Sequence, residues 1–95
     1  MIKLPEFPSV RKELLTEAID GEIVIVHREL ANVHQLNPTA AWIWRKLDGT
    51  NYLDTITDDF CQVFEVEVDV AHRDIRAFLT KLNQLDLLEE YGVKK

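Results

Sequence analysis

The segment from Leu36 to Gly49 constrains the fold of this chain more than any other, because it contains the end of a strand and a whole short helix. Asn37 is a favoured N-cap residue, and Pro38 suits the first helical position, where a backbone N–H is not needed. Asp48-Gly49 then supplies a glycine at which a helix can stop. The sequence therefore predicts a helix from Asn37-Pro38 to about Leu47.

Two strands are predicted before this helix. Residues 22–27 form a run rich in β-branched side chains, whereas residues 10–19 are mixed in character. Asp20-Gly21 lies between them and is a strong two-residue hairpin turn. We therefore expect an antiparallel hairpin.

A third strand is predicted for residues 32–36, after a longer turn over residues 28–31. Side chains alternate between the two faces of a strand. The side chains at 33 and 35 should thus face one side, and those at 34 and 36 the other.

Two further helices are expected after the first. The second covers about Leu53 to Phe64, and the third about Val70 to Leu85 with Asp69 as its cap. In the first helix the predicted inward residues are Ala40, Ile43, Trp44 and Leu47. In the second they are Leu53, Ile56, Phe60 and either Val63 or Phe64. In the third they are Ala71, Ile75, Phe78, Leu79, Leu82 and Leu85.

The order of these elements predicts an α+β fold, with a three-stranded antiparallel sheet followed by three helices in a winged helix-turn-helix-like arrangement. Residues 1–9 contain two prolines and no clear period, and we interpret them as a flexible N-terminal arm. The domain is expected to span residues 10–90, with a C-terminal tail at 91–95. A chain of 95 residues has the length of one domain with a small core.

Charge argues against nucleic acid as a partner. The formal net charge is −6, and the 26 residues between Lys46 and Arg73 contain seven carboxylates and no Lys or Arg. Proteins that bind nucleic acid gain most of their affinity from clustered basic residues. We therefore expect no nucleic-acid binding.

No catalytic or cofactor site is predicted. His27, His34, His72 and Cys61 have no spacing that would bring two of them to one face, so we expect neither a metal nor another cofactor. Cys61 lacks a positive neighbour that would activate its thiol, and we expect the protein not to be an enzyme. A single cysteine, no signal segment and no apolar run of about 18 residues favour a cytoplasmic protein without membrane contact.

Several motifs together resemble the PqqD family, also called RiPP recognition elements. They are LNPTAAWIW at 36–44, LDG at 47–49, apolar residues at 56, 60 and 64, Asp74-Ile75, Phe78-Leu79, Leu82 and Leu87-Leu88. Two positions depart from the family pattern. Tyr52 stands where many relatives have a small hydroxyl residue, and Asp86 stands where the family usually has glycine.

The resemblance implies a function as well as a fold. Family members bind the leader segment of a ribosomally made precursor peptide and present it to a modifying enzyme, often a radical SAM enzyme. The leader is expected to add as a strand beside the third strand and to pack against the third helix. The implied peptide-binding residues are Asn32, Val33, His34, Gln35, Leu36, Arg73, Arg76, Leu79 and Lys81.

Two other hypotheses remain open at this stage. The order of helices would also suit a winged-helix DNA-binding regulator, although the charge opposes it. An open sheet edge could instead pair with a second copy, which would make the protein a homodimerising docking module. Trp42 lies off the apolar stripe of the first helix, so it either marks an interface or packs under the hairpin or the N-terminal arm.

Overall fold

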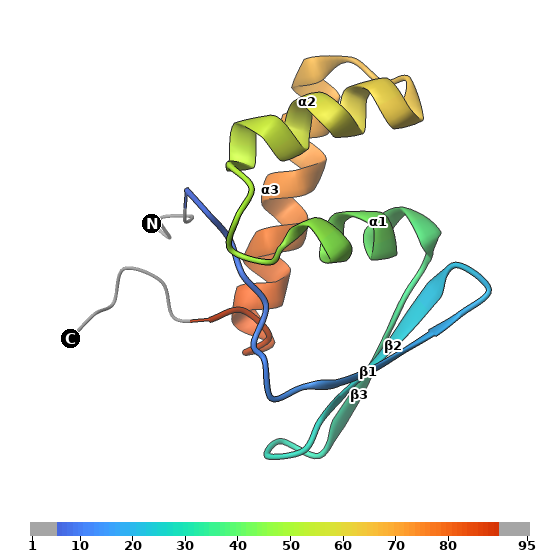
Figure 1. The fold of residues 1–95 in the computed structure, drawn as a ribbon, viewed down its shortest axis with the longest axis vertical. Helices are drawn as coiled ribbons and strands as arrows, with labels where there is room; N and C mark the ends of the chain where they lie inside the picture. Colours follow the sequence, from blue (N-terminus) through green and yellow to red (C-terminus); the bar gives the residue numbers. More distant parts are fainter. Residues whose placement is uncertain (1–5, 90–95) are drawn as a thin grey trace.

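The computed structural model describes residues 6–89 and confirms the predicted α+β fold. Figure 1 shows the sheet at one end of the molecule and the helices at the other. The strands are β1 (Leu15–Ile19), β2 (Glu22–His27) and β3 (Asn32–Leu36), and the helices are α1 (Pro38–Lys46), α2 (Leu53–Phe64) and α3 (Val68–Gln84). The predicted tail at 91–95 lies outside the described residues.

The sheet is antiparallel with the strand order β1-β2-β3, so β2 is the central strand. Asp20 and Gly21 both have positive φ, at 52° and 83°, as a two-residue type I′ hairpin requires. The inward residues of β2 are buried and include Ile25, which is 0% exposed. All five residues of β1 are exposed, because this strand packs on β2 and not beneath a helix.

Helix α1 begins where the sequence predicts. The side-chain Oδ1 of Asn37 accepts a hydrogen bond from the N–H of Ala40 at 2.8 Å, which satisfies one of the free donors of the first turn. Ile43 and Trp44 are buried over the sheet. The chain leaves the helix at Leu47, and Gly49 has a φ of 84° that favours glycine.

Trp42 packs against α2, a contact that neither alternative drawn from the sequence included. Its ring contacts Phe60 and Phe64 with centroid distances of 5.7 Å each, in edge-on geometry. The Nζ atom of Lys46 lies 5.1 Å from the centroid of the indole ring. Among the alternatives for the inward residue of α2, Phe64 packs against the core and Val63 is 55% exposed.

The third helix contributes four buried residues to the core. Three of them, Ala71, Ile75 and Leu79, are each 0% exposed. The predicted cap at Asp69 is wrong, because α3 begins two residues earlier. Glu67 occupies the N-cap position without a side-chain cap bond, and Asp69 lies in the first turn. A carboxylate there still interacts favourably with the helix dipole.

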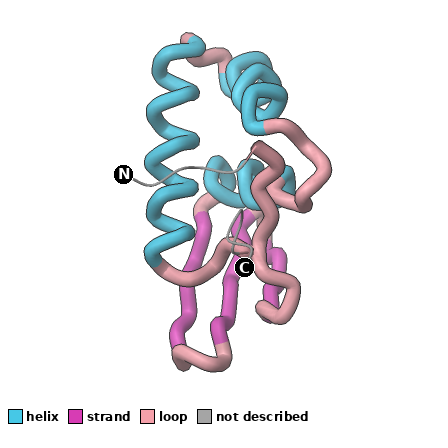
Figure 2. The backbone as a smooth tube through the Cα atoms, turned by 90° about the vertical axis from the view of Figure 1, so that its left-hand side faces the viewer, coloured by secondary structure: helices cyan, strands magenta, loops and turns pink. Residues whose placement is uncertain are grey.

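Residues 6–11 run between the α1–α2 loop and the segment that follows α3 (Figure 2). The N–H of Val10 donates to the carbonyl of Leu47 at 2.9 Å, and the N–H of Arg11 donates to that of Leu87 at 3.0 Å. The N–H of Gly49 donates to the carbonyl of Pro8, which is itself buried. The part of the predicted arm that the structure describes, residues 6–9, is therefore held against the domain by main-chain bonds.

Candidate functional site

A groove of about 400 Å³ runs between strand β3 and the C-terminal half of helix α3. From the strand side it is lined by Val33, His34, Gln35 and Leu36, and from the helix side and the following segment by Phe78, Lys81, Leu82, Leu85 and Leu87. We call this the β3–α3 groove. It brings together segments about 45 residues apart in the chain, which only the tertiary fold can do.

Within the described part of the chain no strand pairs with the outer side of β3, so the strand side of the groove is a free sheet edge. In a two-residue hairpin the closing pair, here Ile19 and Glu22, is hydrogen-bonded, and bonded and non-bonded pairs then alternate along the strands. The registers place Val33 opposite Val26 and Gln35 opposite Val24, where the main-chain groups of β2 point to β1. The N–H and C=O groups of Val33 and Gln35 therefore point away from the sheet.

The helix side of the groove is mostly apolar. Phe78, Leu82 and Leu85 follow one another at intervals of four and three residues, so they lie on one face of α3. Phe78 and Leu85 are half-buried, which leaves part of each side chain accessible from the groove. Such a surface suits apolar side chains that project from an added strand.

Two polar groups in the groove lack partners among residues 6–89. The Nε2 atom of His34 is buried without a hydrogen bond, although the side chain as a whole is half-buried. Lys81 is exposed and has no ion-pair partner in the described part of the chain. A buried nitrogen without a partner is unfavourable, so a ligand that supplies one would gain affinity.

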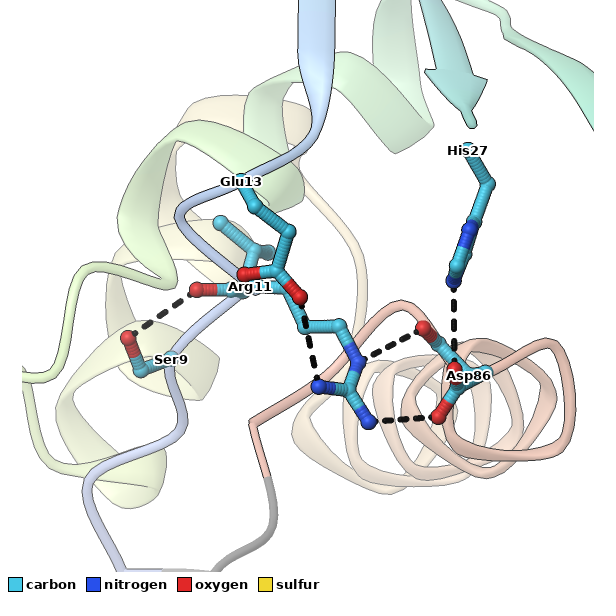
Figure 3. A network of polar contacts seen from close by, with 6 residues as sticks. Ser9, Arg11, Glu13, His27 and Asp86 are labelled. Atoms are coloured by element: carbon cyan, nitrogen blue, oxygen red, sulfur yellow. Dashed lines mark hydrogen bonds and ion pairs between the residues drawn. The ribbon is translucent and has the colours of Figure 1, made fainter. Parts of the chain in front are cut away.

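Asp86 lies between the groove residues Leu85 and Leu87 and binds two side chains from distant segments (Figure 3). The guanidinium of Arg11 donates from Nη2 to Oδ1 at 2.6 Å and from Nε to the main-chain oxygen at 2.9 Å. His27, which is 2% exposed, has its Nε2 at 3.1 Å from Oδ2. Because a carboxylate only accepts, Nε2 carries the proton.

This network also shifts the acidity of Asp86. The hydrogen bond from Arg11 is the main cause that holds the pKa of the Asp86 carboxyl below its usual range. The same contact raises the pKa of Arg11. Asp86 has a φ of 64°, a conformation that suits glycine and that aspartate tolerates better than most residues. Here a side chain at this position fastens the end of α3 to β2 and to the N-terminal segment.

The structure gathers some of the predicted site residues and separates others. Five line the groove: Val33, His34, Gln35, Leu36 and Lys81. Asn32 is exposed at the start of β3, and Arg73 and Arg76 are exposed on α3, but none of the three lines it. Leu79, expected from the sequence to bind the peptide, is 0% exposed and belongs to the core.

Four groove residues were not singled out as site residues from the sequence: Phe78, Leu82, Leu85 and Leu87. Three of them were assigned to the apolar stripe of the third helix, and Leu87 was noted only as part of a motif. An apolar residue at helical spacing gives no sign of whether it faces the core or a groove beside it. The position of β3 decides that distinction.

Within residues 6–89, no group of three or more His, Cys, Asp or Glu side chains could hold a metal ion. The helices in this part of the chain are also too short or too polar to cross a membrane.

Comparison with known proteins identifies the family of this chain. The model of the family PqqD, described as coenzyme PQQ synthesis protein D, matches residues 22–88. The chain belongs to the PqqD family. The matched residues include β2, β3 and all three helices, and so contain the whole β3–α3 groove.

A solved structure gives this PqqD-family domain a close structural relative. TbiB1, in complex with the TbiA(beta) leader peptide, is 27% identical in sequence and superposes with a TM-score of 0.81. The similarity covers 88% of this chain and 98% of the TbiB1 chain. No curated protein sequence matches the chain.

Proposed function

We propose that this PqqD-family protein is a RiPP recognition element that binds the leader segment of a ribosomally made precursor peptide in the β3–α3 groove. The observation that carries the proposal is the free edge of β3, with the main-chain groups of Val33 and Gln35 directed outward beside an apolar helix face. The relative TbiB1 was solved with a leader peptide, which supports the same class of ligand here.

The groove suits a peptide with apolar residues on one face and an acidic residue near Lys81. Four main-chain hydrogen bonds at about 1 kcal/mol each and two apolar anchors at about 2 kcal/mol each give a gross gain of about 8 kcal/mol. Ordering a flexible peptide offsets several kcal/mol of this gain. Micromolar affinity therefore needs the charge of Lys81 and a partner for the buried nitrogen of His34 as well.

Binding is proposed to serve presentation rather than catalysis. The protein would hold the leader while a separate modifying enzyme, such as a radical SAM enzyme, acts on the rest of the precursor. A strand added at β3 leaves the rest of the peptide free to extend beyond the domain.

DNA binding is not favoured by the structure. Helices α2 and α3 are joined by a turn that carries Glu65 and Glu67, and Asp69 lies in the first turn of α3. These carboxylates lie at the end of the helix that a helix-turn-helix protein presents to the major groove. They would repel the phosphate backbone.

The test is a titration with the leader peptide encoded beside this gene, using a proline variant at each sheet edge. Val33→Pro removes an N–H that points to the groove and should weaken binding by about tenfold or more. Thr16→Pro removes an outward N–H from β1 at the opposite edge and should leave peptide affinity within about twofold. Equal affinities for the two variants, or no binding by the wild type, would contradict the proposal.

A further inference from the structure

Among residues 6–89 the sheet has a second free edge, at β1. By the same alternation of bonded pairs, the main-chain groups of Thr16 and Ala18 point away from β2. Natural proteins protect such edges with proline, lysine, bulges or a covering segment. The sequence of β1 is LTEAI, in which Glu17 is the one charged residue.

An apolar surface adjoins this edge on the side of the sheet that faces away from the helices. Leu15, Ile19, Val24 and Val26 line a shallow cavity of about 260 Å³ there, together with Thr16 and Glu17. Leu15 is 48% exposed and Ile19 is 53% exposed. We call these residues and the free edge of β1 the β1 surface. A cluster of exposed apolar residues bordered by charges is typical of an interaction site.

The charge around the β1 surface indicates the chemistry of its partner. Residues 15–26, which contain the whole β1 surface, include three carboxylates, those of Glu17, Asp20 and Glu22, and no Lys or Arg. Glu17 lies within the surface, opposite Val24. A complementary partner would present apolar side chains bordered by Lys or Arg.

A second copy of this chain fits the β1 surface poorly. If two β1 strands paired antiparallel through Thr16 and Ala18, Glu17 would lie directly opposite Glu17 of the other copy. That pair would be a non-hydrogen-bonded one, in which the side chains are closest and like charges are destabilising. The acidic surroundings on both copies would add to this repulsion.

We propose that the β1 surface docks the modifying enzyme while the β3–α3 groove holds the leader peptide. This inference rests on the proposed function, because it assigns the enzyme to the sheet edge that the peptide leaves free. The two edges lie on opposite sides of β2, so both partners can bind at once. The docking site on the enzyme would be apolar with a basic border.

The experiment measures binding of the purified modifying enzyme encoded in the same gene cluster, with and without leader peptide. Glu17→Lys reverses the charge within the β1 surface, and Asp58→Lys makes the same change on the exposed face of α2. Glu17→Lys and Thr16→Pro should each weaken enzyme binding by about tenfold or more, and Asp58→Lys should change it by less than about twofold. Wild-type binding should also weaken as salt increases.

The results separate this inference from the proposed function. If the leader peptide binds as expected but the two β1 variants bind the enzyme like wild type, the inference is wrong and peptide binding stands. A gene cluster without such an enzyme, or a wild type that does not bind it, overturns the inference as well. Sedimentation that shows a dimer abolished by Thr16→Pro would identify a second copy as the occupant and would also overturn it.

Discussion

The Nε2 atom of His27 lies 3.1 Å from Oδ2 of Asp86, so a buried side chain of the central strand holds the residue that follows α3. Asp86 separates two residues that line the β3–α3 groove, Leu85 and Leu87. The contact therefore couples the sheet to the wall of the groove. Arg11 binds the other carboxylate oxygen and adds the N-terminal segment to the same connection.

Two substitutions at Asp86 distinguish the contribution of its side-chain contacts to stability from the contribution of its backbone conformation. Asp86→Ala loses the two carboxylate contacts, to Arg11 Nη2 and His27 Nε2, and keeps an unfavourable positive φ, so it should lower the free energy of unfolding by about 2 kcal/mol. Asp86→Gly loses the same bonds without the backbone strain and should be more stable than the alanine variant by about 1 kcal/mol. Urea denaturation at pH 7 measures both. Equal stability of the two variants would show that the positive φ carries no cost.

The lowered pKa of Asp86 predicts a specific loss of stability in acid. A carboxyl with a folded pKa below its unfolded value of about 3.9 stabilises the fold above that value, and the contribution is lost as pH falls through the folded pKa. The wild type should therefore exceed Asp86→Asn in stability at pH 7, and the difference should shrink below about pH 4. Because the side chain is 44% exposed, solvent screening should keep this change to about 1 kcal/mol or less.

Urea denaturation of the two proteins at pH 7, 5 and 3 tests this prediction. A difference that stays constant over the whole range would contradict the assigned role of the Asp86 charge.

Any side chain at position 49 is predicted to lower the stability of the fold. Its φ is 84°, and a Cβ there would meet Ser9 at an ordinary contact distance of 3.5 Å, so backbone strain rather than crowding is the expected penalty. Gly49→Ala should lower the free energy of unfolding by about 1–2 kcal/mol. Gln62→Ala, an exposed change on α2, should alter it by less than about 0.5 kcal/mol. Thermal or urea unfolding that ranks the two variants equally would contradict this.

Lys81 is predicted to contribute to peptide affinity and not to stability. It lines the groove and has no ion-pair partner among residues 6–89, so Lys81→Glu should weaken binding of an acidic leader by about fivefold or more. Arg73→Glu reverses an exposed charge on the same helix outside the groove and should change affinity by less than about twofold. Isothermal titration calorimetry compares them. A larger effect from Arg73→Glu would show that the acidic residue of the leader contacts the N-terminal half of α3 and not Lys81.

The sequence predicted the parts of the fold that depend on local chemistry. The bounds of β2, β3 and α2, the cap at Asn37 and the hairpin at Asp20-Gly21 all follow from residues close together in the chain. The start of α3 was predicted less well, because Glu67 and Asp69 are both acidic and neither forms a side-chain cap bond.

The contacts between distant segments could not be predicted. Arg11 and Asp86 are 75 positions apart, and His27 and Asp86 are 59 apart, so no periodicity connects them. Leu79 shares its helical face with groove residues, and only the placement of β3 shows that it lies beneath the groove in the core. The exposure of β1 could not be predicted either. It depends on the packing of α1 against β2 and β3, which the sequence of β1 does not indicate.

Hydrogen exchange of backbone amides, followed by NMR with and without the leader peptide, tests the central claim most directly. If the leader adds as a strand at β3, the amides of Val33 and Gln35 should become protected in the complex, whereas those of Thr16 and Ala18 at the opposite edge should exchange as before. Protection confined to β1 or α2, or unchanged exchange at Val33 and Gln35 in a saturated complex, would contradict the account.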